Sequence, residues 1–96
     1  MGAQGTVTLD FGAFPGKSDA SVAVTGQAAI VGTSLAEAWI VPAATVDHTA
    51  DEHMVEPIQV YVRDVVAGTG FTIHAFYRGL GDTEPYGTFN VGWVWN

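Results

Sequence analysis

The densest group of side chains that could do chemistry is the stretch "DHTADEH", residues 47–53, with two histidines and three carboxylates. Imidazole nitrogens and carboxylate oxygens are common ligands of divalent metals. His48, Asp51 and His53 are therefore the candidate metal ligands of this chain. The same groups could act as general acid and base in a metal-dependent enzyme.

The spacing of this stretch argues against a metal site. His48 and His53 are five residues apart, whereas the two histidines of a helical zinc pair are four apart. On a helix, five residues separate two side chains by about 140°, so the imidazoles would diverge. The stretch also lacks the central glycine of a calcium loop. Thr49 and Glu52 have capping-box spacing, which predicts a polar surface loop with at most one helical turn near residues 49–54. We expect no metal and no cofactor.

No other motif predicts catalysis. His74 lies in the middle of an alternating run beside aromatic residues, and no serine lies in a G-x-S-x-G motif. The segments "GTG" at 68–70 and "GLGD" at 79–82 precede no helical pattern and no lysine follows them. They predict hairpin turns and not phosphate-binding loops. We therefore expect a protein that is not an enzyme.

The elements that must position these residues are strands, because apolar side chains recur at every second position. The alternation runs through "TVTLDF", "SVAVTG" and its continuation "QAAIV", "IQVYVRDVV", "FTIHAFYR" and "TFNVGWVWN". "SLAEAW" could instead start a helix capped by Ser34, but Pro42 and the β-favouring "AWIV" favour a strand over residues 36–41. Glycine and proline separate the runs. The pattern predicts one all-β domain over residues 1–96, an antiparallel sandwich or barrel of about seven short strands.

Aromatic residues mark the candidate interface. The last strand carries large apolar side chains on one face, and either a second sheet or a neighbouring subunit must cover them. The residues that we expect to contact a partner are Phe89, Val91, Trp93, Trp95, Trp39 and Tyr61. An alternative use of aromatic rings is a sugar-stacking platform like that of carbohydrate-binding modules, formed by Tyr61, Phe76, Tyr86 and Trp39.

Composition limits the class of partner. Lysine and arginine total three and the net charge is −7, so the chain cannot supply the basic surface that nucleic acids and anionic membranes require. Charged residues are only 14% of the chain, which suggests that another protein covers part of the surface and predicts a homo-oligomer. Cysteine is absent, which excludes disulfides and thiolate metal sites. The start, "MGAQGTVTLDFG", has no signal-peptide pattern.

Several motifs in order resemble a known family: "LDFGAFPG", "SVAVTGQ", "EAWI", "DHTADEH", "GTGFTI" and the ending "GTFNVGWVWN". The chain resembles the small, cysteine-free structural proteins of tailed-bacteriophage virions, over residues 7–96. The resemblance implies a head decoration, head-fibre or tail-associated component, made in the host cytoplasm and located in the virion. It implies no catalytic residues. Relatives in this family often have a longer segment before the last strand than residues 78–87 here.

Together these observations predict a non-enzymatic virion protein that self-associates and binds a capsid or tail partner. Two alternatives remain open. The first is a carbohydrate-binding or adhesion module, which would bind a host-surface glycan. The second is a metal-dependent enzyme centred on "DHTADEH".

Overall fold

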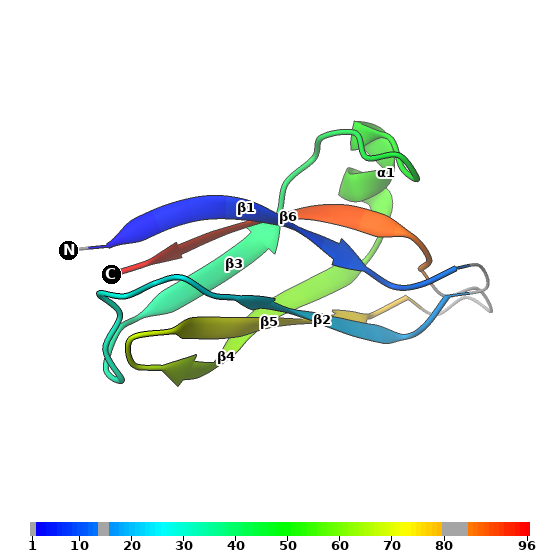
Figure 1. Cartoon of the computed structure of the whole chain (residues 1–96). Helices are drawn as coiled ribbons and strands as arrows, with labels where there is room; N and C mark the ends of the chain where they lie inside the picture. The colour runs from blue at the N-terminus through cyan, green and yellow to red at the C-terminus, as the bar shows by residue number, and fades with distance from the viewer. Residues whose placement is uncertain (1, 14–15, 80–84) are drawn as a thin grey trace.

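Two antiparallel sheets pack face to face in the computed structural model, which describes residues 2–13, 16–79 and 85–96 (Figure 1). One sheet has the strand order β1-β6-β3 and the other has the order β2-β5-β4. In chain order the elements are β1 Ala3–Asp10, β2 Asp19–Val24, β3 Ala36–Ile40, α1 Ala50–Val55, β4 Ile58–Val66, β5 Gly70–Tyr77 and β6 Thr88–Trp95. The prediction of a mostly β, sandwich-like fold with one short helical turn is confirmed.

The alternating pattern of the sequence determines which side of each strand is buried. In β6, Phe89, Val91, Trp93 and Trp95 point into the space between the sheets, and residues at even positions point outward. Residues 3, 5, 7 and 9 of β1 and residues 71, 73 and 75 of β5 do the same. Because successive side chains of a strand point to opposite faces, one buried face follows from each alternating run.

The core shows what covers the apolar face of the last strand. β6 is the central strand of its sheet, and the rings of Phe71 and Trp93 meet across the two sheets with centroids 5.5 Å apart. Phe11 and Phe89 make a second edge-to-face contact at 5.8 Å. The second sheet therefore covers the apolar face of β6, which is one of the two covers that the sequence allows. The residues concerned are Phe89, Val91, Trp93 and Trp95.

Six strands form among the described residues where the sequence predicts about seven. The alternation of "SVAVTG" was expected to continue through "QAAIV", but β2 ends at Val24. Gly26 has a φ of 78°, and the amide of Ile30 donates to the carbonyl of Gln27 in a turn. A left-handed glycine cannot continue a strand, so this segment leaves the sheet and buries only Ile30.

The β4–β5 connection is the hairpin that "GTG" predicts. Gly68 and Gly70 have φ values of 74° and 155°, where a side chain would be strained. Shortly before this hairpin, the register of β4 against β5 shifts between Arg63 and Val66, which marks a β-bulge. At this bulge Asp64 adopts a φ of 60°, which is the left-handed region. Most of "GLGD" lies outside the described residues.

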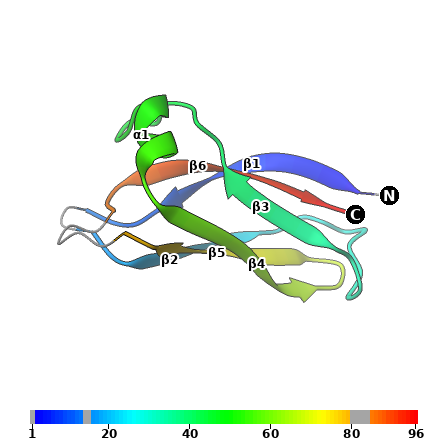
Figure 2. The same ribbon diagram turned by 180° about the vertical axis from the view of Figure 1, so that it is seen from behind.

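The two ends of the described chain lie side by side. Ala3 pairs with Trp95, so the start of β1 and the end of β6 emerge together at one end of the sandwich (Figure 2). The helix α1 lies toward the opposite end, above the β1-β6-β3 sheet and away from β2-β5-β4 (Figure 1). No helix in the described part of the chain has the length and apolar character needed to cross a membrane.

Candidate functional site

The "DHTADEH" segment forms α1 through a complete capping box. The amide of Glu52 donates to the Thr49 hydroxyl at 3.2 Å, and the Glu52 carboxylate accepts from the Thr49 amide at 2.7 Å. These bonds satisfy helix-start amides that have no partner within the helix. Asp51 and Glu52 lie in the first turn, where negative charge is favourable. The helical turn predicted from Thr49 and Glu52 is confirmed.

The segment around α1 covers an exposed edge of β6. β3 ends at Ile40, so the first residues of β6 have no neighbouring strand on that side. Side chains supply the missing partners. The Asp47 carboxylate accepts from both the amide and the hydroxyl of Thr88 at 2.8 Å, and the Thr45 hydroxyl donates to the Thr88 carbonyl at 2.8 Å. We call residues 45–55 the edge latch, because their side chains form hydrogen bonds with the backbone of β6 where a neighbouring strand is missing.

His53 completes the edge latch with both ring nitrogens. Its Nε2 accepts from the backbone amide of Asn90 at 3.0 Å, and its Nδ1 lies 2.8 Å from the Thr49 carbonyl. A carbonyl can only accept and an amide N–H can only donate, so the proton must be on Nδ1. The contacts therefore specify the neutral imidazole with an Nδ1–H. His53 is 3% exposed, so both polar nitrogens are paired inside the protein.

His48 is also buried, at 7% exposure, and packs flat on Phe89 with ring centroids 4.2 Å apart. Its Nε2 is hydrogen-bonded to the Tyr86 carbonyl, and its Nδ1 lies 3.6 Å from the Glu52 carboxylate. The expectation that the two imidazoles diverge on a polar surface loop is thus wrong. His48 precedes the helix, so the two rings meet at 6.5 Å over Phe89.

The two carboxylates of the edge latch are stabilised in their charged form. Hydrogen bonds from the side chain and backbone of Thr88 lower the pKa of Asp47 below its usual value of 3.8. A backbone hydrogen bond from Thr49 lowers the pKa of Glu52 below its usual 4.5. Both groups accept hydrogen bonds that the ionised carboxylate prefers.

The candidate ligands do not assemble into a metal centre. Among the described residues no three His, Cys, Asp or Glu side chains are placed to hold one ion. Asp51 is exposed, while His48 and His53 are buried and engaged in the hydrogen bonds above. Metal binding at these histidines would break the contacts that hold the edge latch on β6. The arrangement is suited to covering a sheet edge.

A second group of residues lies on the outer face of the β2-β5-β4 sheet. Tyr61 on β4 and Phe76 on β5 are 43% and 40% exposed, and their ring centroids are 6.2 Å apart. Arg63 lies two residues from Tyr61 on β4, and Arg78 lies two residues from Phe76, just after β5. His74 pairs with Tyr61 across the strands. We call this set the Tyr61 face: Tyr61, Arg63, His74, Phe76 and Arg78.

At the Tyr61 face, Asp64 has a left-handed backbone and His74 has a ring nitrogen without a hydrogen-bond partner among the described residues. The Asp64 carboxylate lies 4.0 Å from Nε of Arg63 and 3.7 Å from Nε2 of His74. The His74 Nε2 is buried and has no hydrogen-bond partner among the described residues, because 3.7 Å exceeds hydrogen-bond length. The left-handed φ of Asp64 costs about 1–2 kcal/mol in a non-glycine residue. Strain and unsatisfied buried polar atoms are rare and cluster at functional sites.

The four aromatic residues expected to form a sugar platform do not come together. Tyr61 and Phe76 are adjacent, whereas Trp39 lies on β3, in the other sheet, at 45% exposure. The Trp39 indole covers Gly92, where an added Cβ would lie 2.7 Å from its Nε1. The Tyr86 ring packs against His48 in the edge latch, with centroids 5.1 Å apart.

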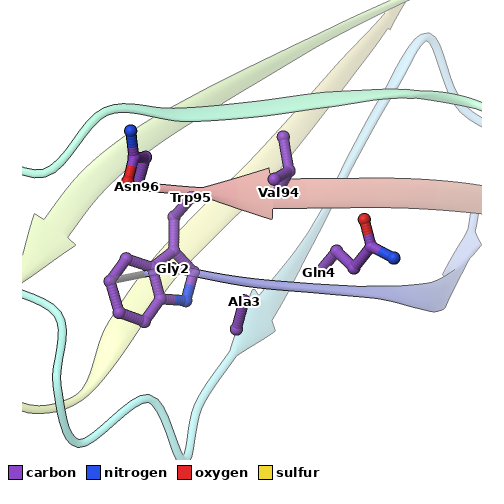
Figure 3. A pocket seen from close by; sticks show the side chains of 6 residues that line it. All are labelled: Gly2, Ala3, Gln4, Val94, Trp95 and Asn96. Carbon is purple, nitrogen blue, oxygen red and sulfur yellow. The ribbon is translucent and has the colours of Figure 1, made fainter.

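Several hollows lie on the described surface. One, about 430 Å³, lies at the joined ends of β1 and β6 (Figure 3) and is lined by Gly2, Ala3, Gln4, Val94, Trp95 and Asn96. A second, about 300 Å³, lies beside Trp39. A third, about 360 Å³, lies between the edges of β3 and β4 and contains Glu37 and Tyr61.

Two features of the site were missed in the sequence. The burial of His48 and His53 has no local signal, since both lie among charged residues. The bulge at Asp64 does have one. Ile58, Val60 and Val62 are apolar at even positions, but Asp64 interrupts them and Val65 takes over the buried face. Such a change of phase is what an extra residue in a strand produces.

Comparisons with known proteins add no family to these observations. No protein-family model matches the chain, and no similar curated protein or solved structure was found.

Proposed function

We propose that this chain is a non-enzymatic structural protein of a bacteriophage virion that self-associates and binds a capsid or tail partner. The observation that carries the proposal is the exposure of large apolar side chains on a domain with few charges. Trp39, Tyr61 and Phe76 are each at least 40% exposed, and only 14% of the residues are charged. Exposed apolar groups of this kind mark surfaces that another protein covers.

The fold supports the same proposal. A sandwich with its core residues turned inward presents two outer faces and can be tiled in symmetric copies. The edge latch covers the part of β6 that β3 leaves without a neighbouring strand, so this part is protected from pairing with a foreign strand. The motif resemblance described above supplies the virion setting.

The test of the proposal is association with particles. Purified virions from cells that express the protein are separated on a density gradient, and an antibody to this chain is used for immunoblotting and for labelling in electron micrographs. We expect the chain to band with particles and to label one defined position, either head or tail. A chain that stays entirely in the unbound fraction while particles form would refute the virion proposal.

One observation favours a second candidate, a carbohydrate-binding module. The Tyr61 and Phe76 rings are adjacent and exposed, with charged and polar groups nearby. Aromatic rings beside hydrogen-bonding groups are suited to sugars. A glycan array of the wild type, Tyr61→Ala and Trp39→Ala tests it. Only Tyr61→Ala should abolish binding, because Trp39 lies in the other sheet. Binding that survives the loss of Tyr61 would exclude this platform.

A further inference from the structure

We infer that the Tyr61 face binds the α1 region of a second copy of this chain, in a head-to-tail contact. The inference rests on the proposed self-association and names the two surfaces that make it. It assigns the Tyr61 face a protein occupant.

The Tyr61 face has the composition of an interface centre. Its aromatic pair is exposed, and two of the three basic residues of the chain flank this pair. Tyrosine and arginine are the residue types enriched at binding hot spots. Arg78 is exposed and makes no ion pair with any residue that the structure describes. Asp64 and Asp19 also lie on this sheet face, and the face as a whole is close to neutral.

The α1 region has the complementary character. Residues 47–56 contain four carboxylates and no lysine or arginine. Met54 and Val55 are 71% and 76% exposed, although α1 is fixed to β6 through His53 on its other side. An apolar tip beside acidic groups fits an exposed aromatic pair beside Arg78, because apolar contact and a charge pair with Arg78 can form together.

The two surfaces cannot meet within one molecule. The edge latch holds α1 on the β1-β6-β3 sheet, and the Tyr61 face is the outer side of β2-β5-β4 (Figures 1 and 2). The contact must therefore join two copies through different surfaces. A heterologous contact of this kind produces a ring if its rotation closes and a filament if it does not.

The experiment uses one disabling variant for each surface. Arg78→Glu reverses one positive charge of the Tyr61 face, and Lys17→Glu is its control with the same change in net charge. Met54→Glu places a charge in the apolar tip of α1. Leu35→Glu is its control, because Leu35 is 77% exposed and bonds Asn96 at the end with the chain termini. Circular dichroism confirms that each variant is folded.

Sedimentation velocity at matched concentrations should show wild-type oligomers that both controls retain. Arg78→Glu and Met54→Glu should each weaken self-association at least about tenfold. The mixture of these two variants is decisive. Each keeps one intact surface, and the disabled surfaces are both acidic, so the mixture should form a 1:1 dimer and nothing larger.

Three results would overturn the inference. They are a wild type that remains monomeric, disabling variants that associate like their controls, and a mixture that fails to dimerise although both variants have lost self-association. A monomeric wild type whose Tyr61→Ala variant loses glycan binding would assign the face to sugars instead. Particle association is measured separately, so the virion proposal can survive when this contact fails.

Discussion

At the scale of single residues, the polar groups of "DHTADEH" act through hydrogen bonds to backbone. Asp47 bonds Thr88, His53 bonds Asn90, and Glu52 bonds Thr49. The contacts between side chains and main chain explain why a stretch that has the composition of a catalytic centre is used to hold a helix on a sheet.

The carboxylates of the edge latch should make the protein acid-labile. Hydrogen bonds lower the pKa of Asp47 and of Glu52 in the folded state, so the unfolded chain takes up protons at higher pH than the folded one. Their contribution is present above the unfolded values of 3.8 and 4.5 and is lost as the pH falls through the lower folded values. We expect the Asp47→Asn/Glu52→Gln variant to lose less stability than the wild type between about pH 5 and about pH 3.

Urea denaturation at each pH measures this difference. Asp51→Asn on the same helix is the control and should follow the wild type, since its exposed carboxylate lies outside the bonds to Thr88 and Thr49. Parallel pH profiles for the double variant and the wild type would contradict the role assigned to Asp47 and Glu52.

Gly5 is required by the ring that covers it. An added Cβ would lie 2.6 Å from Cζ2 of Trp93, and this indole is buried between the sheets. We expect Gly5→Ala to lower the free energy of unfolding by about 1–3 kcal/mol through overpacking. Gly32→Ala is the matched control, because nothing lies within 4 Å of the added atom. Thermal unfolding of both variants is the measurement, and equal midpoints would disprove the close contact.

At the scale of elements, the main feature is the part of β6 that has no neighbouring strand on the side of β3. β6 is longer than its neighbour β3, so part of its backbone would face solvent or a foreign strand. The edge latch pairs with that part, and the buried rings of His48 and His53 pack on Phe89 beneath it. A loop and a short helix thus supply the hydrogen bonds that a neighbouring strand would otherwise make to this part of β6.

His53→Ala should release the edge latch. The change removes two hydrogen bonds, leaves the Asn90 amide without its partner and empties a buried site. We expect a loss of about 2–4 kcal/mol in the free energy of unfolding. Hydrogen exchange should show faster exchange at the amides of Thr88 and Asn90.

Met54→Ala serves as the control for this prediction, because Met54 is the next residue on α1 and is exposed. Its cost should stay within about 0.5 kcal/mol, as for most surface substitutions. Unchanged protection of the Asn90 amide in His53→Ala would show that the edge latch is held by other contacts.

At the scale of the whole molecule, stability comes from joining the two sheets. The sheets are connected by side-chain packing, which includes the ring contact between Phe71 and Trp93. A chain of this size has a total stability of about 5–15 kcal/mol, so a single large core ring is a substantial part of it.

Phe71 and Phe76 provide a matched test on one strand. Phe71 is buried against Trp93, while Phe76 points outward from the same strand. We expect Phe71→Ala to cost about 3–5 kcal/mol and Phe76→Ala less than about 1 kcal/mol. Chemical denaturation at low protein concentration, where copies are separate, gives both values. Similar losses for the two variants would contradict the packing of the sheets.

The exposure of Phe76 bears on association between copies and not on the core. Phe76 belongs to the Tyr61 face, so its removal should affect association between copies more than folding. Phe71 has the reverse role. The two faces of β5 therefore have different roles: one packs in the core and the other belongs to the proposed contact. This is possible because successive side chains of a strand point to opposite faces.

The sequence by itself determined the fold class, the buried side of most strands and the capped turn at Thr49. These properties depend on residues two to four positions apart, and such spacing can be read directly. It also indicated the change of phase at Asp64, although this signal was missed.

Only the tertiary structure decided where the site residues lie. His53 meets Asn90 across 37 residues and Asp47 meets Thr88 across 41, and Tyr61 meets Phe76 but not Trp39. These contacts depend on the order of strands and on where β3 ends, which the local pattern of side chains does not specify. Long-range pairing buried His48 and His53 against Phe89 and placed Trp93 and Trp95 between the sheets, because burial depends on which elements are neighbours in space.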